Sequence, residues 1–547
     1  MPARVRAPEL SGDGGWIGVE RPLSLKALRG KVVLLHFWTY SCVNCLRVIE
    51  ELRRLERRFT EELVVVGVHS PKFPREAEHE SLERAVRRHR IAHPVLDDPN
   101  LTTWDRYGIK AWPTLVLVDP KGYVAGALSG EGHGRQLAKV IAEVVARHEK
   151  KGTLATEPID IDPVMPPGGL LAFPGKVAVS ADGMRVAIAD TAHDQVLVCT
   201  TDGLVLEAHT GFIQPQGVRF DGDAVMVCDA GANRVVRTDG VVLADGMSSP
   251  WDVVVDGDGS LVIAEAGRHR LARVRAGEQR VLLAAGTGEE GMEDDDATKA
   301  LLAQPSGVTR TPEGIIFVDA EASALRVLTR AGKVVTLVGQ GLFDWGADDG
   351  GPDDARLQHP LGVAASADGR HVYVADTFNS LLRAWDGETL RTLAVDGLSE
   401  PGGLDVLADG RLVVADTNNH RILVVDPLTG ASEPLELDET WLMSTAGPAL
   451  SVPSGELLGV PVSVDLADEE LDLSAGDPVR ISIEARPASL LVDGPSDWSL
   501  AAAEGQVELR AGEPGGGLLL VEVVTRTRRG ERSAVRVRRS RHRLDIT

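Results

Sequence analysis

Residues 32–45 read Val-Val-Leu-Leu-His-Phe-Trp-Thr-Tyr-Ser-Cys-Val-Asn-Cys, an apolar run that leads into a Cys-x-x-Cys motif. The run from Val32 to Phe37 predicts a buried strand, and apolar residues then recur at helical spacing from Leu46 to Phe59. Cys42 is therefore expected at the N-terminus of a helix. The helix dipole and the free N–H groups there stabilise a thiolate, so we predict that Cys42 is the exposed thiol of lower pKa.

The second cysteine of the motif, Cys45, lies one helical turn further on and can attack a mixed disulfide formed at Cys42. Such a pair is typical of thiol–disulfide exchange. A zinc site needs four ligands, and the other two cysteines, Cys199 and Cys228, lie far along the chain. The histidines that follow the motif show no ligand spacing, so no metal is predicted. An inert thioredoxin-like scaffold is the other alternative.

Composition narrows the class of protein. A chain of 547 residues is long enough for two to four domains. It has four cysteines, an N-terminus without an apolar signal-like segment, and no apolar run of membrane-spanning length. These features predict a cytoplasmic protein with no membrane association.

The net charge of −23 is spread unevenly. Residues 1–150 hold 24 basic and 19 acidic residues, whereas residues 151–440 hold 22 basic and 46 acidic ones. Residues 441–547 hold 12 basic and 16 acidic residues. The strongly acidic middle segment would repel a phosphate backbone, so a nucleic-acid partner is not expected.

The first segment alternates strands and helices. Strands are predicted at Leu63–Val68, Leu115–Val118 and Tyr123–Leu128, and a last helix is predicted from about Gly134 to Lys150. This alternation, closed by an antiparallel hairpin and a helix, predicts an α/β sandwich.

Three stretches of this segment resemble thioredoxin-fold proteins of the TlpA/DipZ type: Phe37–Cys45, Val68–Phe73 and Ala111–Thr114. The resemblance implies that Cys42 attacks, that Cys45 resolves, and that Pro113 is the cis-proline beside them. It also implies that Trp112 positions an extended client segment through backbone hydrogen bonds.

Two positions depart from the thioredoxin pattern. His36 stands where thioredoxin has a buried acid, and it either relays the proton of Cys45 or packs as a core histidine. Glu76, in an inserted connection, either supplies that acid or is a solvated loop carboxylate. The pair Val43-Asn44 replaces Gly-Pro between the cysteines, which leaves the direction of exchange open.

A repeat begins near Phe173. Each unit opens with a Pro-x-Gly-like segment, continues through an acidic-Gly turn, and ends a strand in an acid. Two hairpins in about 40 residues predict a four-stranded blade. The strand-end acids are interpreted as scaffolding, because six copies cannot all be catalytic. The opening prolines are Pro174, Pro215, Pro250, Pro305, Pro360 and Pro401, and the strand-end acids are Asp190, Asp229, Glu265, Asp319, Asp376 and Asp416.

The last repeat, Val414–Ile422, resembles the NHL signature, and Ala375–Asn379 is a near copy. Six units therefore resemble a six-bladed NHL β-propeller, which we expect to close by pairing strands from its two ends. Two long inter-blade loops carry acid clusters at Asp294–Asp296, Asp348–Asp349 and Asp353–Asp354. These lack the alternating spacing of a calcium loop, so solvated loops are predicted.

Beyond Trp441, alternating apolar runs with Gly/Pro turns predict a small, all-β, sandwich-like domain. The expected fold class is thus multidomain: a thioredoxin-like domain at 1–150, a six-bladed propeller at 151–440 and a β-rich domain at 441–547. This order resembles the NHL-repeat-containing protein 2 family, which implies a cytosolic protein with a redox centre and a binding scaffold.

The sequence therefore predicts a cytosolic thiol–disulfide oxidoreductase whose propeller holds a protein client. The expected partners are a client with a disulfide or dithiol and a cytosolic reductant, and the chain is expected to be a monomer without a cofactor. The alternative is a non-enzymatic interaction scaffold with a redox-inactive or redox-sensing thioredoxin-like domain.

Overall fold

The computed structural model describes residues 5–162, 164–440, 445–446, 449–463, 470–471, 478–492, 496–500, 504–529 and 532–547. The chain divides into two compact units. One comprises Met1–Leu197 and His209–Glu436, and the other comprises Val198–Ala208 and Leu437–Thr547. No helix among the described residues is long and apolar enough to span a bilayer.

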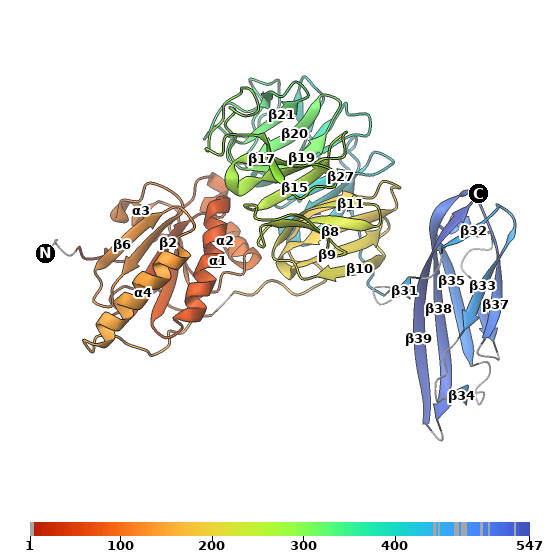
Figure 1. The fold of residues 1–547 in the computed structure, drawn as a ribbon, viewed down its shortest axis with the longest axis horizontal. Helices are drawn as coiled ribbons and strands as arrows, with labels where there is room; N and C mark the ends of the chain where they lie inside the picture. The colour runs from red at the N-terminus through yellow and green to blue at the C-terminus, as the bar shows by residue number, and fades with distance from the viewer. Residues whose placement is uncertain are drawn as a thin grey trace. The chain divides into compact units, whose positions relative to one another are not determined.

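The first part of the chain is a six-stranded sheet with helices on both faces (Figure 1). The strand order is β1-β4-β3-β2-β5-β6, in which β2 pairs in parallel with β3 and antiparallel with β5. The strands are β1 (Gly15–Ile17), β2 (Val32–Trp38), β3 (Leu63–His69), β4 (Val95–Asp97), β5 (Thr114–Val118) and β6 (Val124–Ser129). The helices are α1 (Val43–Arg58), η1 (Pro74–Ala77), α2 (His79–Arg88), α3 (Thr102–Tyr107) and α4 (Gly134–Glu149).

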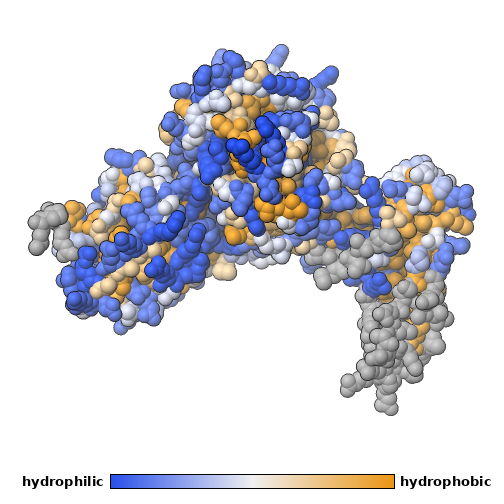
Figure 2. Space-filling view, in the orientation of Figure 1, coloured by the Kyte–Doolittle hydropathy of each residue, from blue (hydrophilic) through white to orange (hydrophobic). Residues whose placement is uncertain are grey.

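Strand β2 is buried along its whole length because it lies in the middle of the sheet. Its residues alternate between two cores, as side chains of a strand do. Leu34 packs with residues of α1 and α4, whereas Leu35 and Phe37 pack with Trp104 of α3. This central strand carries the chain directly into the Cys-x-x-Cys turn. Figure 2 shows hydrophilic residues over much of this domain in the view drawn.

The middle of the chain forms six four-stranded sheets, each made of consecutive strands. The first three blades are β7 (Pro174–Val179), β8 (Arg185–Asp190), β9 (Gln195–Thr200) and β10 (Val205–Thr210); β11 (Pro215–Asp221), β12 (Ala224–Asp229), β13 (Arg234–Arg237) and β14 (Val242–Ala244); β15 (Pro250–Val255), β16 (Leu261–Glu265), β17 (Arg270–Val274) and β18 (Val281–Ala285). The last three are β19 (Pro305–Arg310), β20 (Gly314–Asp319), β21 (Ala324–Thr329) and β22 (Val334–Val338); β23 (Gly362–Ala365), β24 (Val372–Asp376), β25 (Leu381–Trp385) and β26 (Leu390–Thr392); β27 (Gly403–Val406), β28 (Leu412–Asp416), β29 (Arg421–Val425) and β30 (Ser432–Pro434). Short 3-10 turns follow four of the strands, at η2 (Thr191–His193), η3 (Ala266–Arg268), η4 (Thr377–Asn379) and η5 (Thr417–Asn419).

Each blade consists of consecutive strands, so the ring is not sealed by a blade that combines strands from its two ends. The expected pairing of the two ends is limited to an isolated parallel bridge between Leu204 and Asp438, where Val205 N donates to the Asp438 carbonyl at 2.8 Å. The first strand of each blade contacts that of the next, and β27 contacts β7 to complete the ring. Thr417 Oγ1 donates to the carbonyl of Pro174 at 2.8 Å, as Thr377 Oγ1 donates to that of Pro401 at 2.8 Å. The last blade is thus joined to the first by the same strand contact and the same threonine hydrogen bond that join consecutive blades.

Each strand-end acid forms a hydrogen bond with the segment that leads into its own blade. The carboxylate accepts a hydrogen bond from the backbone N–H two residues before the opening proline. Asp416, for example, accepts from Ser399 N at 2.8 Å, and Asp376 accepts from Gln358 N at 2.7 Å. The other four pairs are Asp190 with Ala172, Asp229 with Ile213, Glu265 with Ser248 and Asp319 with Ala303. These contacts match the predicted scaffolding role.

The acid clusters of the two long loops are not simply solvated, because one acid of each loop binds a buried arginine. Asp349 accepts from Arg383 at 2.7 Å, and Asp294 accepts from Arg326 at 2.9 Å. Both guanidinium groups are fully buried, and each also pairs with the strand-end acid of its own blade. The cation that each loop holds is therefore an arginine from a neighbouring strand.

The C-terminal unit contains a seven-stranded and a two-stranded sheet among its described residues. Val460 and Val507 of the smaller sheet share one apolar core with Ile481 and Val521 of the larger, as in a sandwich. The strands are β31 (Thr445–Ala446), β32 (Leu450–Val452), β33 (Leu457–Ser463), β34 (Glu470–Leu471), β35 (Val479–Arg486), β36 (Ser496–Leu500), β37 (Glu504–Arg510), β38 (Gly515–Arg529) and β39 (Arg532–Ile546), with the 3-10 turn η7 (Ala488–Leu490).

Candidate redox site

Cys42 is the N-cap of α1, as the sequence predicts. Its sulfur accepts from the backbone N–H of Cys45 at 3.4 Å, and both thiols are free. A side-chain hydrogen bond with Cys45, and then the charge of Lys72, lower the pKa of Cys42 against the opposing effect of burial. Burial raises the pKa of Cys45 well above its usual range. The pKa of Cys42 is therefore lowered, as a nucleophile requires, and that of Cys45 is raised, as suits a resolving thiol.

The predicted exposure of Cys42 is wrong. Cys42 is 6% exposed and Cys45 is fully buried. Both belong to an apolar cluster that includes Tyr40 and Phe73 of the thioredoxin-like domain and Phe378 of the propeller. The propeller therefore contributes to the burial of both thiols.

Gln304 of the propeller lies on the backbone at either side of Cys42. Its Oε1 accepts from Val43 N at 2.9 Å, and its Nε2 donates to the carbonyl of Ser41 at 2.9 Å. The carboxamide therefore pairs with the Cys-x-x-Cys turn through one donor and one acceptor, as a neighbouring strand would. This contact occupies backbone groups on either side of Cys42.

Lys72 joins the two domains beside the thiols. Its Nζ lies 3.1 Å from Oε2 of Glu321 in the propeller, and 5.4 Å from the centre of the Trp112 ring. The two charged side chains are 11% and 5% exposed. Burial disfavours the charged form of both side chains, but each charge stabilises the other. Glu321 raises the pKa of Lys72, and Lys72 lowers the pKa of Glu321. Sequence analysis did not identify this pair.

Glu76 is buried, so its interpretation as a solvated loop carboxylate is wrong. One oxygen accepts from Thr39 Oγ1 and from Ser41 N at 2.8 Å. The other accepts from Lys72 N at 2.8 Å and from Phe73 N at 3.0 Å. Burial raises its pKa despite these bonds. Glu76 thereby fixes the segment before Cys42 to the loop that carries Lys72.

His36 lies in the core on β2, stacked 6.1 Å from the Trp38 ring. Neither of its ring nitrogens has a hydrogen-bond partner among the described residues, and the same holds for His69 on the adjacent strand. Burial lowers the pKa of His36 well below its usual range and that of His69 to about 3. Both histidines are therefore neutral at physiological pH. These features fit the core-packing alternative for His36, and its role as a relay stays a prediction.

The Trp112–Pro113 peptide bond is cis, which confirms the prediction. Trp112 donates from Nε1 to the carbonyl of Ser70 at 2.8 Å and packs against the cluster that holds both cysteines. Pro113 is buried at the start of β5. The cis-proline loop, the Lys72 loop and the Cys-x-x-Cys turn thus meet at one place.

Four of the six residues that precede the opening prolines contact the thioredoxin-like domain, and the other two line the cavity beside it. Each of these six residues has a left-handed backbone, with φ between 45° and 68°. In addition to Gln304, Glu400 binds Arg88 of α2 at 2.7 Å, and His359 lies 5.3 Å from the Phe73 ring. The full set is Phe173, Gln214, Ser249, Gln304, His359 and Glu400. The repeated proline was the signal in the sequence, but in four blades it is the variable residue before the proline that forms the contact.

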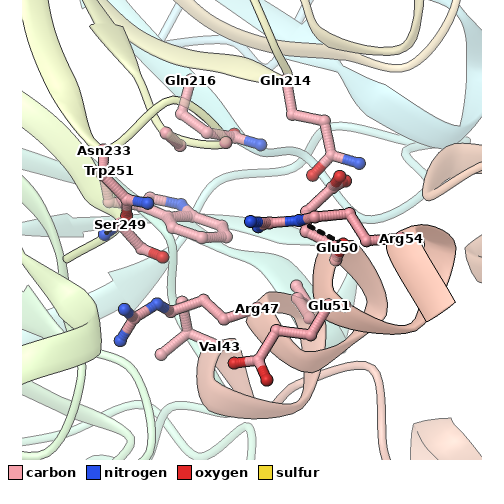
Figure 3. Close-up of a pocket in the computed structure, with 13 residues that line it drawn as sticks. Val43, Arg47, Glu50, Glu51, Arg54, Gln214, Gln216, Asn233, Ser249 and Trp251 are labelled. Carbon is pink, nitrogen blue, oxygen red and sulfur yellow. Dashed lines mark hydrogen bonds between the residues drawn. The ribbon is translucent and has the colours of Figure 1, made fainter. Parts of the chain in front are cut away.

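A polar cavity of about 100 Å³ lies beside the site, between α1 and the propeller (Figure 3). Arg54 of α1 extends into it, opposite Gln214, Gln216 and Trp251 of the propeller. Arg47 also lines it and pairs with Glu131 and Ser248. Among the described residues, no group of three or more His, Cys, Asp or Glu side chains is placed to hold a metal ion.

Comparison with known proteins agrees with this architecture. Residues 30–124 match the family model described as thioredoxin-like, and residues 398–425 match the NHL repeat. NHL repeat-containing protein 2 of Gallus gallus is 35% identical over 507 residues, which cover 77% of this chain and 70% of that protein. Protein SUPPRESSOR OF QUENCHING 1, chloroplastic, of Arabidopsis thaliana is 31% identical over 494 residues, which cover 77% and 46% of the two chains. Thiol-disulfide oxidoreductase YkuV of Bacillus subtilis is 25% identical over 150 residues, which cover 27% of this chain and all of that enzyme (100%).

Fold, site and similarity together define a protein in which a thioredoxin-like domain, homologous to thiol–disulfide oxidoreductases, precedes a six-bladed NHL propeller. The similarity to the chicken protein extends across most of both chains. The chain belongs to the NHL repeat-containing protein 2 family.

Proposed function

We propose that this protein is a thiol–disulfide oxidoreductase in which Cys42 attacks a protein client and Cys45 resolves the mixed disulfide. The observation that carries the proposal is the contrast between the two thiols. Cys42 caps α1 and has a lowered pKa, whereas Cys45, one turn inside the helix, has a raised pKa. Only the thiolate is nucleophilic, so this contrast assigns the first attack to Cys42.

In the reducing direction, the Cys42 thiolate attacks one sulfur of a client disulfide. The client sulfur–sulfur bond breaks, the mixed disulfide forms, and the departing client thiolate takes a proton. Cys45 then loses its proton and attacks the Cys42 sulfur, which leaves a Cys42–Cys45 disulfide and a second client thiol. A cytosolic dithiol reductant returns the pair to the free thiols. The oxidising direction is the reverse of these steps.

The surrounding residues receive roles in this scheme. Trp112 and Pro113 align the client segment beside Cys42. Glu76 acts as a positioning residue, because its oxygens accept from Ser41, Lys72 and Phe73 backbone groups. His36 is the proposed relay for the Cys45 proton, and a His36→Leu change tests it through the pH dependence of the resolving step.

Each domain has a separate role in this proposal. Residues 1–150 carry the chemistry, residues 151–440 select the client, and residues 441–547 form a separate β domain. The acidic charge of the middle segment favours a basic client by electrostatic steering. The proposed setting is the cytoplasm, with the chain acting as a monomer.

Turnover of a model disulfide with dithiothreitol as donor tests the proposal. The Cys42→Ser variant should lose enzymatic turnover, and the Cys45→Ser variant should accumulate mixed disulfides, because no thiol remains to release the client. Cys199→Ser is the matched control, since Cys199 is buried in β9 and burial raises its pKa to about 12. That control should retain the wild-type rate.

A second function is favoured by the burial of Cys42 at 6% exposure. In that case the thioredoxin-like domain is a structural partner of the propeller, and the whole protein is an interaction scaffold. Equal turnover by the wild type and by Cys42→Ser would support the scaffold and reject the enzyme.

A further inference from the structure

We propose that Glu321 of the propeller restrains the reactivity of Cys42 by pairing with Lys72, so that the redox centre is shared between the two domains. This inference rests on the proposed function, since it concerns the same nucleophile. It assigns to two residues outside the Cys-x-x-Cys motif a positioning and tuning role.

The ion pair lies beside the apolar cluster of the two thiols, which also contains Phe73, the neighbour of Lys72 in the chain. Lys72 Nζ is 3.1 Å from the Glu321 carboxylate, and the two side chains lie almost entirely out of water. Charges interact more strongly at such a place than at the surface, because little solvent screens them. Glu76 accepts from the backbone N–H of Lys72 at 2.8 Å, which fixes the loop segment that carries the lysine.

The two charges act on Cys42 in opposite directions. The Lys72 cation lowers the pKa of the thiol, and the Glu321 anion raises it. While the domains are in contact, the ion pair is neutral overall and its effect on the thiol is reduced. Without Glu321, an uncompensated cation remains beside Cys42 and favours the thiolate.

The other titratable groups that face this ion pair come from several elements. They are Cys45 of α1, Glu290 in the loop after β18, and two propeller histidines. Burial lowers the pKa of His359 to about 4, so that ring is neutral near pH 7. The second histidine is His269, which follows η3.

Access and reactivity are therefore coupled in one interface. Gln304 covers the backbone of Ser41 and Val43, and Glu321 offsets Lys72, and both residues belong to the same propeller. A movement that lifts the propeller from α1 would remove both at once. It would expose Cys42 to a client and lower its pKa in the same step.

The test is the pH dependence of Cys42 alkylation by iodoacetamide in the full chain, with the modified residue read by fragment mass spectrometry. Glu321→Gln keeps an acceptor for Lys72 but removes the charge. The midpoint for Cys42 should fall by about one pH unit, which raises the rate up to about tenfold below the midpoint. Lys72→Met should move the midpoint upward.

Glu400→Gln is the matched control. Glu400 is a buried propeller carboxylate that binds Arg88 of the same thioredoxin-like domain, at 2.7 Å. If loosening the domain contact were sufficient, both Glu→Gln variants would shift the midpoint alike. We expect no shift for Glu400→Gln.

An unchanged or raised midpoint in Glu321→Gln, or an equal shift in Glu400→Gln, would overturn the inference. If Glu321→Gln does not fold, Lys72→Met serves as the test. A Cys42 midpoint that does not rise in that variant would overturn the inference. The readout needs no client and no turnover. The proposed function can therefore fail in the turnover assay while the charge coupling stands, and the reverse outcome is equally distinguishable.

Discussion

The propeller and the thioredoxin-like domain differ in where their buried polar groups find hydrogen-bond and ion-pair partners. In the propeller, Asp416 accepts from its own blade's entry segment and from Arg421 at 2.8 Å. In the thioredoxin-like domain, His36 and His69 have no hydrogen-bond partner among the described residues, and Lys72 finds its partner in the propeller. The strand-end acids of the blades are thus satisfied within the propeller and serve stability, whereas the buried Lys72 beside the thiols depends on the contact between the domains.

The largest effect is expected from breaking a locally satisfied site. Arg383→Leu leaves two carboxylates, Asp376 and Asp349, without their shared buried cation. Removing one partner of a buried ion pair costs about 3–5 kcal/mol, and we expect a loss of that size in chemical denaturation. Arg421→Leu is the control, because Arg421 is 38% exposed and binds one carboxylate. Equal losses in the two variants would contradict the distinction between buried and peripheral arginines.

A smaller effect is expected from the unpartnered histidines, through pH. Burial lowers the pKa of His69 to about 3 in the folded state, against about 6.5 when unfolded. Below pH 6.5 the unfolded chain binds a proton that the folded chain does not, so stability falls as pH decreases. His69 alone should cost about 2 kcal/mol at pH 5.

The pH dependence of unfolding in His69→Leu checks this expectation. The variant should lose less stability than the wild type between pH 7 and pH 5. His371→Leu, at an exposed position, should follow the wild type. A wild-type slope in His69→Leu would show that this ring is not held neutral.

The smallest effect is a change in the access to Cys42. Gln304→Ala removes two hydrogen bonds to the Cys-x-x-Cys turn, each worth about 1 kcal/mol. Modification of Cys42 by a polyethylene-glycol maleimide should therefore rise by about tenfold. Gln214→Ala is the control, because Gln214 precedes the equivalent proline of another blade and lines the cavity beside α1. Similar rates in all three proteins would mean that Gln304 does not cover the site.

Local patterns in the sequence were sufficient for the fold. The apolar run before Cys42 gave the central strand, and the repeated prolines and acids gave six blades. The resemblance to thioredoxins supplied the cis-proline at Pro113. These features depend on residues that lie close together in the chain or recur at a fixed interval.

Contacts between distant segments were not predictable in the same way. Gln304 and Val43 are 261 residues apart, and Lys72 and Glu321 are 249 apart. No periodicity links such positions, so the burial of Cys42 was missed. Glu76 was misjudged because its burial depends on a loop that folds back onto Ser41, and the acid clusters were misjudged because Arg326 and Arg383 lie on strands far along the chain.

The order in which the two motif thiols react tests the assignment of Cys42 as the nucleophile most directly. Alkylation of the reduced wild-type chain across a range of pH, resolved between Cys42 and Cys45 by fragment mass spectrometry, measures it. Cys42 should be modified first, with a midpoint below the free-thiol value of about 8.5, while Cys45 should stay unmodified until higher pH. Earlier modification of Cys45, or identical midpoints for both thiols, would contradict the assignment of Cys42 as the nucleophile.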